Sequence, residues 1–384
     1  MLRLSNAFWG QSKASSFDTL SLVDAGCAAG LWRQASSGFW ELDCFGAALQ
    51  TRMERRLHAM MARLGSHQIQ LGLMQDQALW DATGRDADYG DELYGLVDRR
   101  GRRMRLAATA EEAATSAAAR HASMGGSRSM WAHQIGAKWR DETRARGALA
   151  RAREFRMLDA YSFCQGAEEA RSIHALCLAG FEKEFKALGI QAQARAADCG
   201  EVGGLESVEI VCSSAELGDA NGELELAHLF LLGDRYSKAF GLLGKDGLSM
   251  QMGCQGLGSS RLLMALAESR RGSTGFAGDE AACSHLFWVS ALDFHSDATS
   301  RDDALALASA AGFDGILDDR DMAAGRKLRD AEMGMCAYRL VASKRQASTR
   351  TVELRAMTET ASRSLSLAEA LNFVAERRAA CALG

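Results

Sequence analysis

The chain has 384 residues, of which 47% are hydrophobic and 24% charged, and its formal net charge is −4. These are the values of an ordinary soluble protein that is long enough for two domains and a large core. No segment is apolar over the length needed to span a bilayer, which excludes a membrane protein. The ten cysteines include no C-x-x-C pair and no matching His spacing, so a structural zinc site is not expected, and a reducing, cytoplasmic setting is.

The chain contains no proline, although about nineteen would be expected at ordinary usage. Its 38 glycines supply the turns instead. A loss spread over the whole chain indicates a pressure on composition, not on one site.

Apolar spacing predicts the elements of the first 270 residues in chain order. Helices are expected at 18–36, 46–65, 163–189 and 259–271. Strands are expected at 67–74, 130–142, 191–200, 206–214, 224–233 and 248–258, with a loop, a hairpin and a helix between 78 and 123. Antiparallel strands flanked by helices predict an α+β sheet, not a βαβ series.

A segment of glycine, serine and small residues at 271–283 predicts a domain boundary. Beyond it, a compact α/β unit of about a hundred residues is expected, because strands alternate with helices. The expected strands are 285–294, 313–319, 337–343 and 349–357, and the expected helices are 301–312, 325–334 and 366–378. The predicted division is a first domain at 1–272, a linker at 273–282 and a second domain at 283–384.

The segment 138–163 combines dense charge with a following apolar and aromatic run. If its start is a strand, Arg140 and Glu142 share one face, and Arg151 and Phe155 share a face of the returning strand. Guanidinium groups on phosphates, a carboxylate on an amino group and a stacking ring would suit a nucleotide. The alternative is a solvated amphipathic hairpin, which is what charge clusters usually form. A second basic run, 99–105, is read equally well as a solvated loop or as a contact to nucleic acid.

Two further patterns carry chemistry. Thr109 and Glu111 form a T-x-E pair that could hold a secondary ammonium, although by itself a helix N-cap is the better reading. The glycines of 253–258 read G-x-x-G-x-G, which is not a dinucleotide fingerprint, and a helix carrying Arg261 follows them.

Together, these segments resemble the prolyl-tRNA synthetases, a family of class II aminoacyl-tRNA synthetases. The charged segment is similar to motif 2 at 138–163, the helix at 46–65 with its lead-in to motif 1 at 38–65, and the glycine segment to motif 3 at 249–268. The resemblance implies a homodimer formed through motif 1, and an anticodon-binding domain at 283–384.

The resemblance also implies roles for individual residues. Arg140 and Arg261 would be catalytic, and Glu225 would contact ATP or Mg²⁺. The expected ATP site is Arg140, Glu142, Arg151, Phe155, Glu225, Gly256, Gly258 and Arg261. The expected proline site is Thr109, Glu111, Arg140, His228 and Cys254. The expected anticodon contacts are Arg320, Lys327 and Asp330, next to Asp318 and Asp319.

The chain departs from the family in several places. Gln255 replaces the usual tyrosine of motif 3, and residues 322–325 lack the two charges of the family's Glu-Arg-Pro-Gly, which puts strict anticodon reading in doubt. About a dozen residues at 212–223 stand where many bacterial relatives carry an editing domain, so mischarged alanyl-tRNA would be released unless a separate trans-editing factor clears it. The family's prolines are replaced at four quoted positions: Cys44, Ala108, Ala145 and Ala337.

The expected function is therefore a proline–tRNA ligase that uses ATP and Mg²⁺ with tRNA(Pro) as partner. The missing prolines lead to the hypothesis of a backup or resistance copy that can be made when proline or prolyl-tRNA is limiting. One alternative is a paralogue that activates proline or an analogue for a non-tRNA acceptor. Another is a non-catalytic regulatory paralogue, against which the retained Glu111, Arg140, Glu142 and Arg261 argue.

Overall fold

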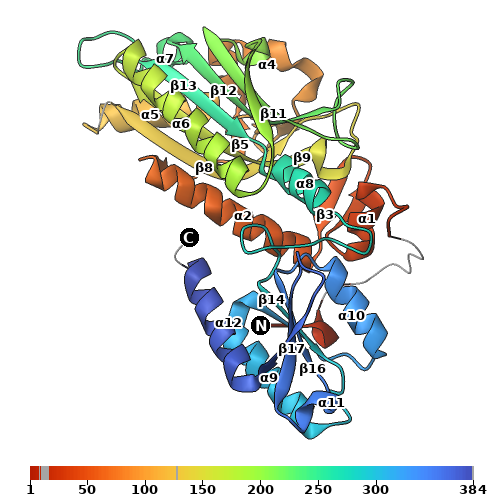
Figure 1. The fold of residues 1–384 in the computed structure, drawn as a ribbon. Helices are drawn as coiled ribbons and strands as arrows, with labels where there is room; N and C mark the ends of the chain where they lie inside the picture. Colours follow the sequence, from red (N-terminus) through yellow and green to blue (C-terminus); the bar gives the residue numbers. More distant parts are fainter. Residues whose placement is uncertain (8, 10–16, 127–128, 383–384) are drawn as a thin grey trace. The chain divides into compact units, whose positions relative to one another are not determined.

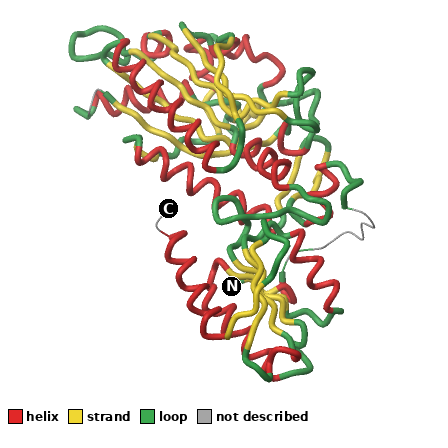
Figure 2. Tube along the Cα trace, viewed as in Figure 1, coloured by secondary structure: helices red, strands yellow, loops and turns green. Residues whose placement is uncertain are grey.

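The structure, a computed structural model, describes residues 1–7, 9, 17–126 and 129–382. It divides into two compact units, in each of which helices flank strands (Figures 1 and 2). The central unit contains Ser36–Trp40 and Glu54–Ala265, and the terminal unit contains Met1–Ala35, Glu41–Met53 and Leu266–Gly384. None of the helices in the described part of the chain combines the length and the apolar character of a membrane span.

A seven-stranded sheet in the order β10-β11-β12-β13-β9-β8-β4 is the centre of the central unit. Neighbouring strands are antiparallel, except that β4 and β8 are parallel. The strands are β4 (His67–Gln68), β8 (Met130–Trp139), β9 (Glu154–Cys164), β10 (Ala192–Ala197), β11 (Glu206–Ser213), β12 (Glu223–Gly233) and β13 (Gln251–Leu257). The predicted α+β sheet is confirmed.

Helices and a small sheet complete the central unit. The amphipathic helix α6 (Ala167–Ala187) crosses the large sheet and packs on β9, β10, β12 and β13 (Figure 1). A second sheet consists of β5 (Met74–Asp76), β7 (Arg103–Leu106) and β6 (Gly95–Val97), all antiparallel. The other helices are α3 (Gln77–Thr83), α4 (Arg85–Tyr89), α5 (Glu111–Ser123), α7 (Arg235–Ala239) and α8 (Ser259–Arg270), of which α8 belongs to this unit up to Ala265.

The helix expected at 18–36 is shorter in the structure. Helix α1 (Leu22–Ala29) ends because Gly30 adopts a left-handed conformation with φ of 74°, which favours glycine. The chain then forms β2 (Trp32–Ser36), which pairs with β3 (Phe39–Leu42). The long helix expected at 46–65 is confirmed as α2 (Cys44–Arg63). Cys44, where the family resemblance implies a proline, is the first helical residue, a position that proline favours.

The terminal unit has a six-stranded sheet in the order β1-β15-β14-β16-β17-β18. β1, β15, β14 and β16 are mutually parallel, and β17 and β18 continue the sheet antiparallel. The strands are β1 (Leu2–Arg3), β14 (Phe287–Ala291), β15 (Gly315–Asp318), β16 (Tyr338–Ala342), β17 (Thr351–Ala356) and β18 (Arg363–Ser366). The short strands β1 and β18 were not predicted from the sequence.

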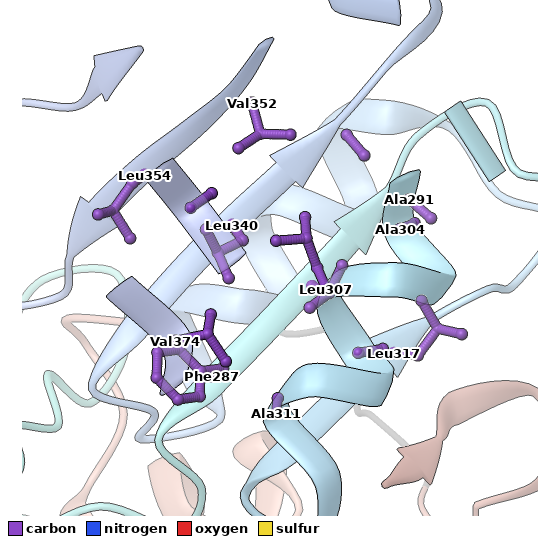
Figure 3. Packing of buried hydrophobic residues seen from close by; sticks show 14 of the residues in the cluster. Phe287, Ala291, Ala304, Leu307, Ala311, Leu317, Leu340, Val352, Leu354 and Val374 are labelled. Carbon is purple, nitrogen blue, oxygen red and sulfur yellow. The ribbon is translucent and has the colours of Figure 1, made fainter. Parts of the chain in front are cut away.

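Four helices surround this sheet: α9 (Ala298–Ala311), α10 (Ala324–Met333), α11 (Lys344–Ala347) and α12 (Leu367–Ala382). Figure 3 shows how Leu307 and Ala311 of α9 and Val374 of α12 meet Phe287 and Leu340 of the sheet in one buried cluster. Such burial of apolar surface is the main stabilising term for the unit.

Candidate active site

One cavity of about 440 Å³ in the central unit is lined by every residue of the expected ATP and proline sites. These residues are Thr109, Glu111, Arg140, Glu142, Arg151, Phe155, Glu225, His228, Cys254, Gly256, Gly258 and Arg261. They come from separate parts of the sequence, and the antiparallel sheet brings them together.

The local structure around motif 2 differs from the prediction. Strand β8 ends at Trp139, and β9 begins at Glu154, opposite it. Arg140 and Glu142 therefore follow the strand, and Arg151 precedes β9, so the prediction that these residues lie on strand faces was wrong. The reason is a tight turn, in which the Glu142 N–H donates to the Arg140 carbonyl at 2.7 Å.

Arg151 and Glu142 form an ion pair at the cavity wall. The Nε of Arg151 donates to Glu142 Oε2 at 2.7 Å, and the Arg144 N–H donates to Glu142 Oε1 at 2.8 Å. Partial burial raises the pKa of Glu142, but these two hydrogen bonds outweigh it and lower the pKa below its ordinary value. The ion pair holds Arg151 at the cavity wall through its Nε.

Arg140 is held by aromatic rings. Its guanidinium carbon lies 5.3 Å from the ring centre of Phe155 and 6.0 Å from that of Tyr89, distances that suit cation–π attraction. One terminal nitrogen donates to the Ala108 carbonyl at 3.4 Å, and Nε has no hydrogen-bond partner among the described residues. The group is thus positioned in the cavity wall with donor capacity left for an anion.

Arg261 is anchored by main-chain oxygens. Its Nε donates to the Ala150 carbonyl at 2.9 Å, and Nη1 donates to the Glu225 carbonyl at 3.1 Å. Nη1 also lies 3.5 Å from the Glu225 carboxylate. The contacts tie the start of α8 to the motif 2 loop and to β12, so the cation has a fixed place in the site.

A buried acidic centre lies at another part of the cavity, around Glu111. Thr109 donates a short hydrogen bond to Glu111 Oε2, and Cys254 Sγ donates to Oε1 at 3.2 Å. Arg85 Nη1 donates to Oε2 at 3.1 Å. Burial raises the pKa of Glu111, but Arg85 and Thr109 outweigh it and bring the pKa below its ordinary value, so the carboxylate is ionised at neutral pH.

Glu225 and His228 form the candidate metal position. His228 Nδ1 lies 3.4 Å from Glu225 Oε1, and one ligand atom each of Glu209, Glu225 and His228 fall within 4.8 Å of one another. Arg195 already pairs with Glu209 at 2.6 Å. Burial raises the pKa of Glu225, but His228 and Arg261 lower it overall, and an ionised carboxylate is the kind of oxygen ligand that fits Mg²⁺.

Gly256 of β13 forms part of the cavity floor, where a side chain would take up space in the cavity. A Cβ on Gly256 would lie no closer than 3.5 Å to a protein atom, so the protein itself has room for a methyl group and the cavity would lose that space. A Cβ on Gly253 would lie 2.6 Å from Ser162 Oγ, which is a clash. Gln255 alternates to the other face of β13, is fully buried, and is not among the residues that line the cavity.

Two buried charged groups at the cavity were missed by the sequence reasoning. Asp159 lines it and accepts hydrogen bonds from Lys138 Nζ at 2.8 Å and Tyr161 Oη at 2.6 Å. Arg85 reaches Glu111 from another helix, and no fixed spacing links the two residues. The signal that could have found Arg85 is a lone cation between tryptophan and tyrosine residues in an otherwise acidic segment.

The expected anticodon residues form a network in the terminal unit. Arg320 pairs with Asp318 at 2.7 Å and with Asp330 at 2.8 Å. Lys327 Nζ donates to the Ala291 carbonyl at 2.5 Å. Lys327 and Asp330 are 1% and 0% exposed, so in this conformation they hold Arg320 and α10 in place and do not present their charges at the surface.

Two segments of the chain match the models of two known domain families. Residues 94–270 match the class II tRNA synthetase core domain described for the glycine, histidine, proline, serine and threonine enzymes, and residues 301–377 match an anticodon-binding domain. The fold is similar to prolyl-tRNA synthetase of Giardia lamblia in complex with prolyl-adenylate (TM-score 0.78, 18% identity, 94% of this chain and 76% of that chain). It is equally similar to the Cryptosporidium parvum enzyme with halofuginone and AMPPNP (TM-score 0.78, 14% identity, 96% and 80%). The fold and the two matched domains define a class II aminoacyl-tRNA synthetase.

Curated relatives identify the family within this class. A probable mitochondrial proline–tRNA ligase of Schizosaccharomyces pombe is 30% identical over 349 residues, covering 79% of this chain and 81% of the relative. The proline–tRNA ligase of Ehrlichia canis is 27% identical over 92% of this chain and 95% of its own length. The chain belongs to the proline–tRNA ligase family, as the resemblance of its motifs implied.

Proposed function

We propose that this chain is a proline–tRNA ligase that activates proline with ATP and transfers the prolyl group to the 3′ end of tRNA(Pro). The observation that carries the proposal is the single cavity shared by the Glu111 carboxylate and the guanidinium groups of Arg140, Arg151 and Arg261. An ionised carboxylate suits the secondary ammonium of proline, and guanidinium groups suit its carboxylate and the phosphates of ATP. The Giardia relative is bound to prolyl-adenylate, which carries both the secondary ammonium of proline and a phosphate.

Activation needs no protein nucleophile. The proline carboxylate attacks the α-phosphorus of ATP in line, a carboxyl oxygen–phosphorus bond forms, and the bond to pyrophosphate breaks. Arg140 would bind the proline carboxylate and the α-phosphate, and Arg261 would bind the γ-phosphate. Fixed cations aimed at developing charge, together with positioning of the two reactants, supply the rate enhancement.

The amino-acid end of the site would select by charge and size. Glu111 and Thr109 offer two acceptors for the two N–H groups of the proline ammonium. Cys254 lines the same end, and burial and the nearby Glu111 raise its pKa well above the ordinary value, so it stays a neutral thiol. A small neutral wall next to an acceptor pair fits a pyrrolidine ring.

Mg²⁺ is proposed as the metal, with Glu225 as its protein ligand. Bound there, Mg²⁺ would neutralise charge on the ATP phosphates. Glu225 fits because its carboxylate lines the cavity and its pKa is lowered, whereas Glu209 is engaged by Arg195.

Transfer to tRNA is supported by the anticodon-binding domain match at 301–377. The terminal ribose hydroxyl of tRNA would attack the prolyl carbonyl and release AMP. A paralogue serving a non-tRNA acceptor has no use for an anticodon-binding domain, so this match favours the ligase.

The decisive test measures two reactions with the purified chain. We expect proline-dependent exchange of pyrophosphate into ATP, and charging of tRNA(Pro) with labelled proline. Exchange without charging would favour the non-tRNA acceptor, and no exchange with proline would refute the proposal. Arg140→Ala is expected to lower exchange by roughly 100-fold or more, because it removes a preorganised cation from the developing charge.

Other parts of the proposal concern the setting of the enzyme. A cytoplasmic homodimer is expected from the family resemblance, and light scattering coupled to size exclusion measures the oligomeric state.

Strands β11 and β12 pair directly up to Ser213 and Glu223, so residues 214–222 form a short connection with no room for an editing domain. A separate trans-editing factor is therefore proposed, and mischarging with alanine by the purified enzyme would support it.

The lack of proline supports a role when proline is limiting. A matched control exists, because four positions can be returned to proline: Cys44, Ala108, Ala145 and Ala337. We expect synthesis of the natural chain to continue under proline starvation better than synthesis of the proline-restored chain. Equal loss of both would refute the hypothesis.

A further inference from the structure

Arg85 is a fully enclosed cation near the site. It is 0% exposed and begins α4, directly after Gly84, whose φ of 74° is left-handed. Three aromatic rings lie around its guanidinium carbon, with centroids 5.7 Å away at Trp80, 5.2 Å at Tyr89 and 5.5 Å at Tyr236. This aromatic cage fixes the plane of the group, because guanidinium groups stack on aromatic faces.

The hydrogen bonds of Arg85 converge on two acids. Its Nη1 donates to Glu111 Oε2 at 3.1 Å and to Glu112 Oε1 at 3.0 Å. Its Nη2 donates to Tyr89 Oη at 3.3 Å. One nitrogen thus bridges two neighbouring carboxylates. Of these residues Glu111 lines the cavity, whereas Arg85 and Glu112 are not among its lining residues.

The two carboxylates differ in their environment. Glu112 is fully buried, accepts a further hydrogen bond from Thr83 at 2.9 Å, and its pKa is raised by burial despite Arg85. Glu111 is ionised, for the reasons given above.

We infer that Arg85 is a positioning residue for the amino-acid subsite, which holds the Glu111 carboxylate ionised and oriented toward the ammonium of the substrate. This inference rests on the proposed function for the identity of that substrate. Arg85 does not touch the substrate itself, and it acts through Glu111.

The test compares Arg85→Met with Arg85→Lys in pyrophosphate exchange. Arg85→Met is expected to raise the KM for proline roughly 10- to 100-fold, the range of a charged hydrogen bond, and to leave the KM for ATP within about threefold. The pH profile separates charge from orientation. Without a neighbouring cation, burial raises the pKa of Glu111, so the KM for proline in Arg85→Met should fall as pH rises from about 7 to 9. Arg85→Lys keeps the charge, so its KM should be raised without this pH dependence.

A matched control is Arg105→Met. Arg105 pairs with Asp86 at 2.7 Å in the same region and is not a contact of Glu111, so its loss should leave the KM for proline unchanged. The inference is wrong if Arg85→Met keeps the wild-type KM for proline, or raises both KM values equally.

A stability measurement does not depend on activity. In Arg85→Met, both acids would have raised pKa values in the folded state, so the melting temperature should drop between about pH 5.5 and 8 relative to wild type. Adding Glu111→Gln and Glu112→Gln to this variant should abolish the drop in melting temperature. If the single variant Arg85→Met shows no such drop, the inference is wrong. If the wild-type chain shows no exchange with proline, the proposed function fails, and this measurement alone decides whether Arg85 keeps Glu111 ionised.

Discussion

Replacing Glu111 by glutamine removes an ionised acceptor at the amino-acid end of the cavity. The side chain keeps its shape, so Thr109 and Cys254 can still contact it. Arg85 keeps its second partner, Glu112, at 3.0 Å. The fold should therefore tolerate the change, and we expect a melting temperature within a few degrees of wild type, since about 1 kcal/mol corresponds to about 2–4 °C in a domain of roughly 150–250 residues and to less in a larger one.

The cost to binding can be estimated. A hydrogen bond to a charged group contributes about 1.5–3 kcal/mol, which is roughly a 10- to 150-fold change in an equilibrium constant. Glu111→Gln should raise the KM for proline by about that factor. The KM for ATP should hardly change, because the proposed phosphate contacts are the arginines of the cavity and not Glu111. Proline titrations of pyrophosphate exchange at saturating ATP measure the effect.

Glu112→Gln is the matched control. Glu112 is next in sequence and shares Arg85, but it is fully buried and is not among the residues that line the cavity. Its replacement should leave the KM for proline within about threefold. If Glu111→Gln binds proline as well as wild type, or if both variants lose it equally, Glu111 is not the ammonium site.

Three further predictions concern the floor of the site, the start of α2 and acid stability. Gly256→Ala should fold normally but raise the KM for ATP, whereas Gly253→Ala should lower the melting temperature because its Cβ would lie 2.6 Å from Ser162 Oγ; the reverse ranking would contradict the assignment of the floor. Cys44→Pro should be neutral or stabilise by up to about 1 kcal/mol in denaturant unfolding, because the first helical position accepts proline. His133 is buried and its pKa is lowered to about 4, so the folded state resists protonation and stability should be lost as pH falls from about 6.5 to 4; His133→Gln should lose less over that range.

The sequence was sufficient where a pattern is local and strong. The helix α6 and the strand β12 show their periodicity within one segment, and both were predicted. The helix expected at 18–36 failed because Gly30 ends it, and a glycine inside a helical pattern can be tolerated or can be a cap. The strand β1 was missed because two residues have no periodicity, and its pairing with β15 joins positions more than 300 residues apart.

For the site, the order of the motifs and the residue types within them were enough to identify the family. All the residues predicted for the ATP and proline sites line the cavity. The sequence did not determine their local geometry, because the ends of β8 and β9 depend on pairing between the two strands, and so Arg140 and Glu142 were placed on a strand that stops before them. The buried partner of Glu111 and the enclosure of Lys327 and Asp330 were decided by tertiary structure alone. Burial and ion pairing depend on segments distant in the sequence, and a charged side chain looks the same in the sequence whether it meets solvent or a partner.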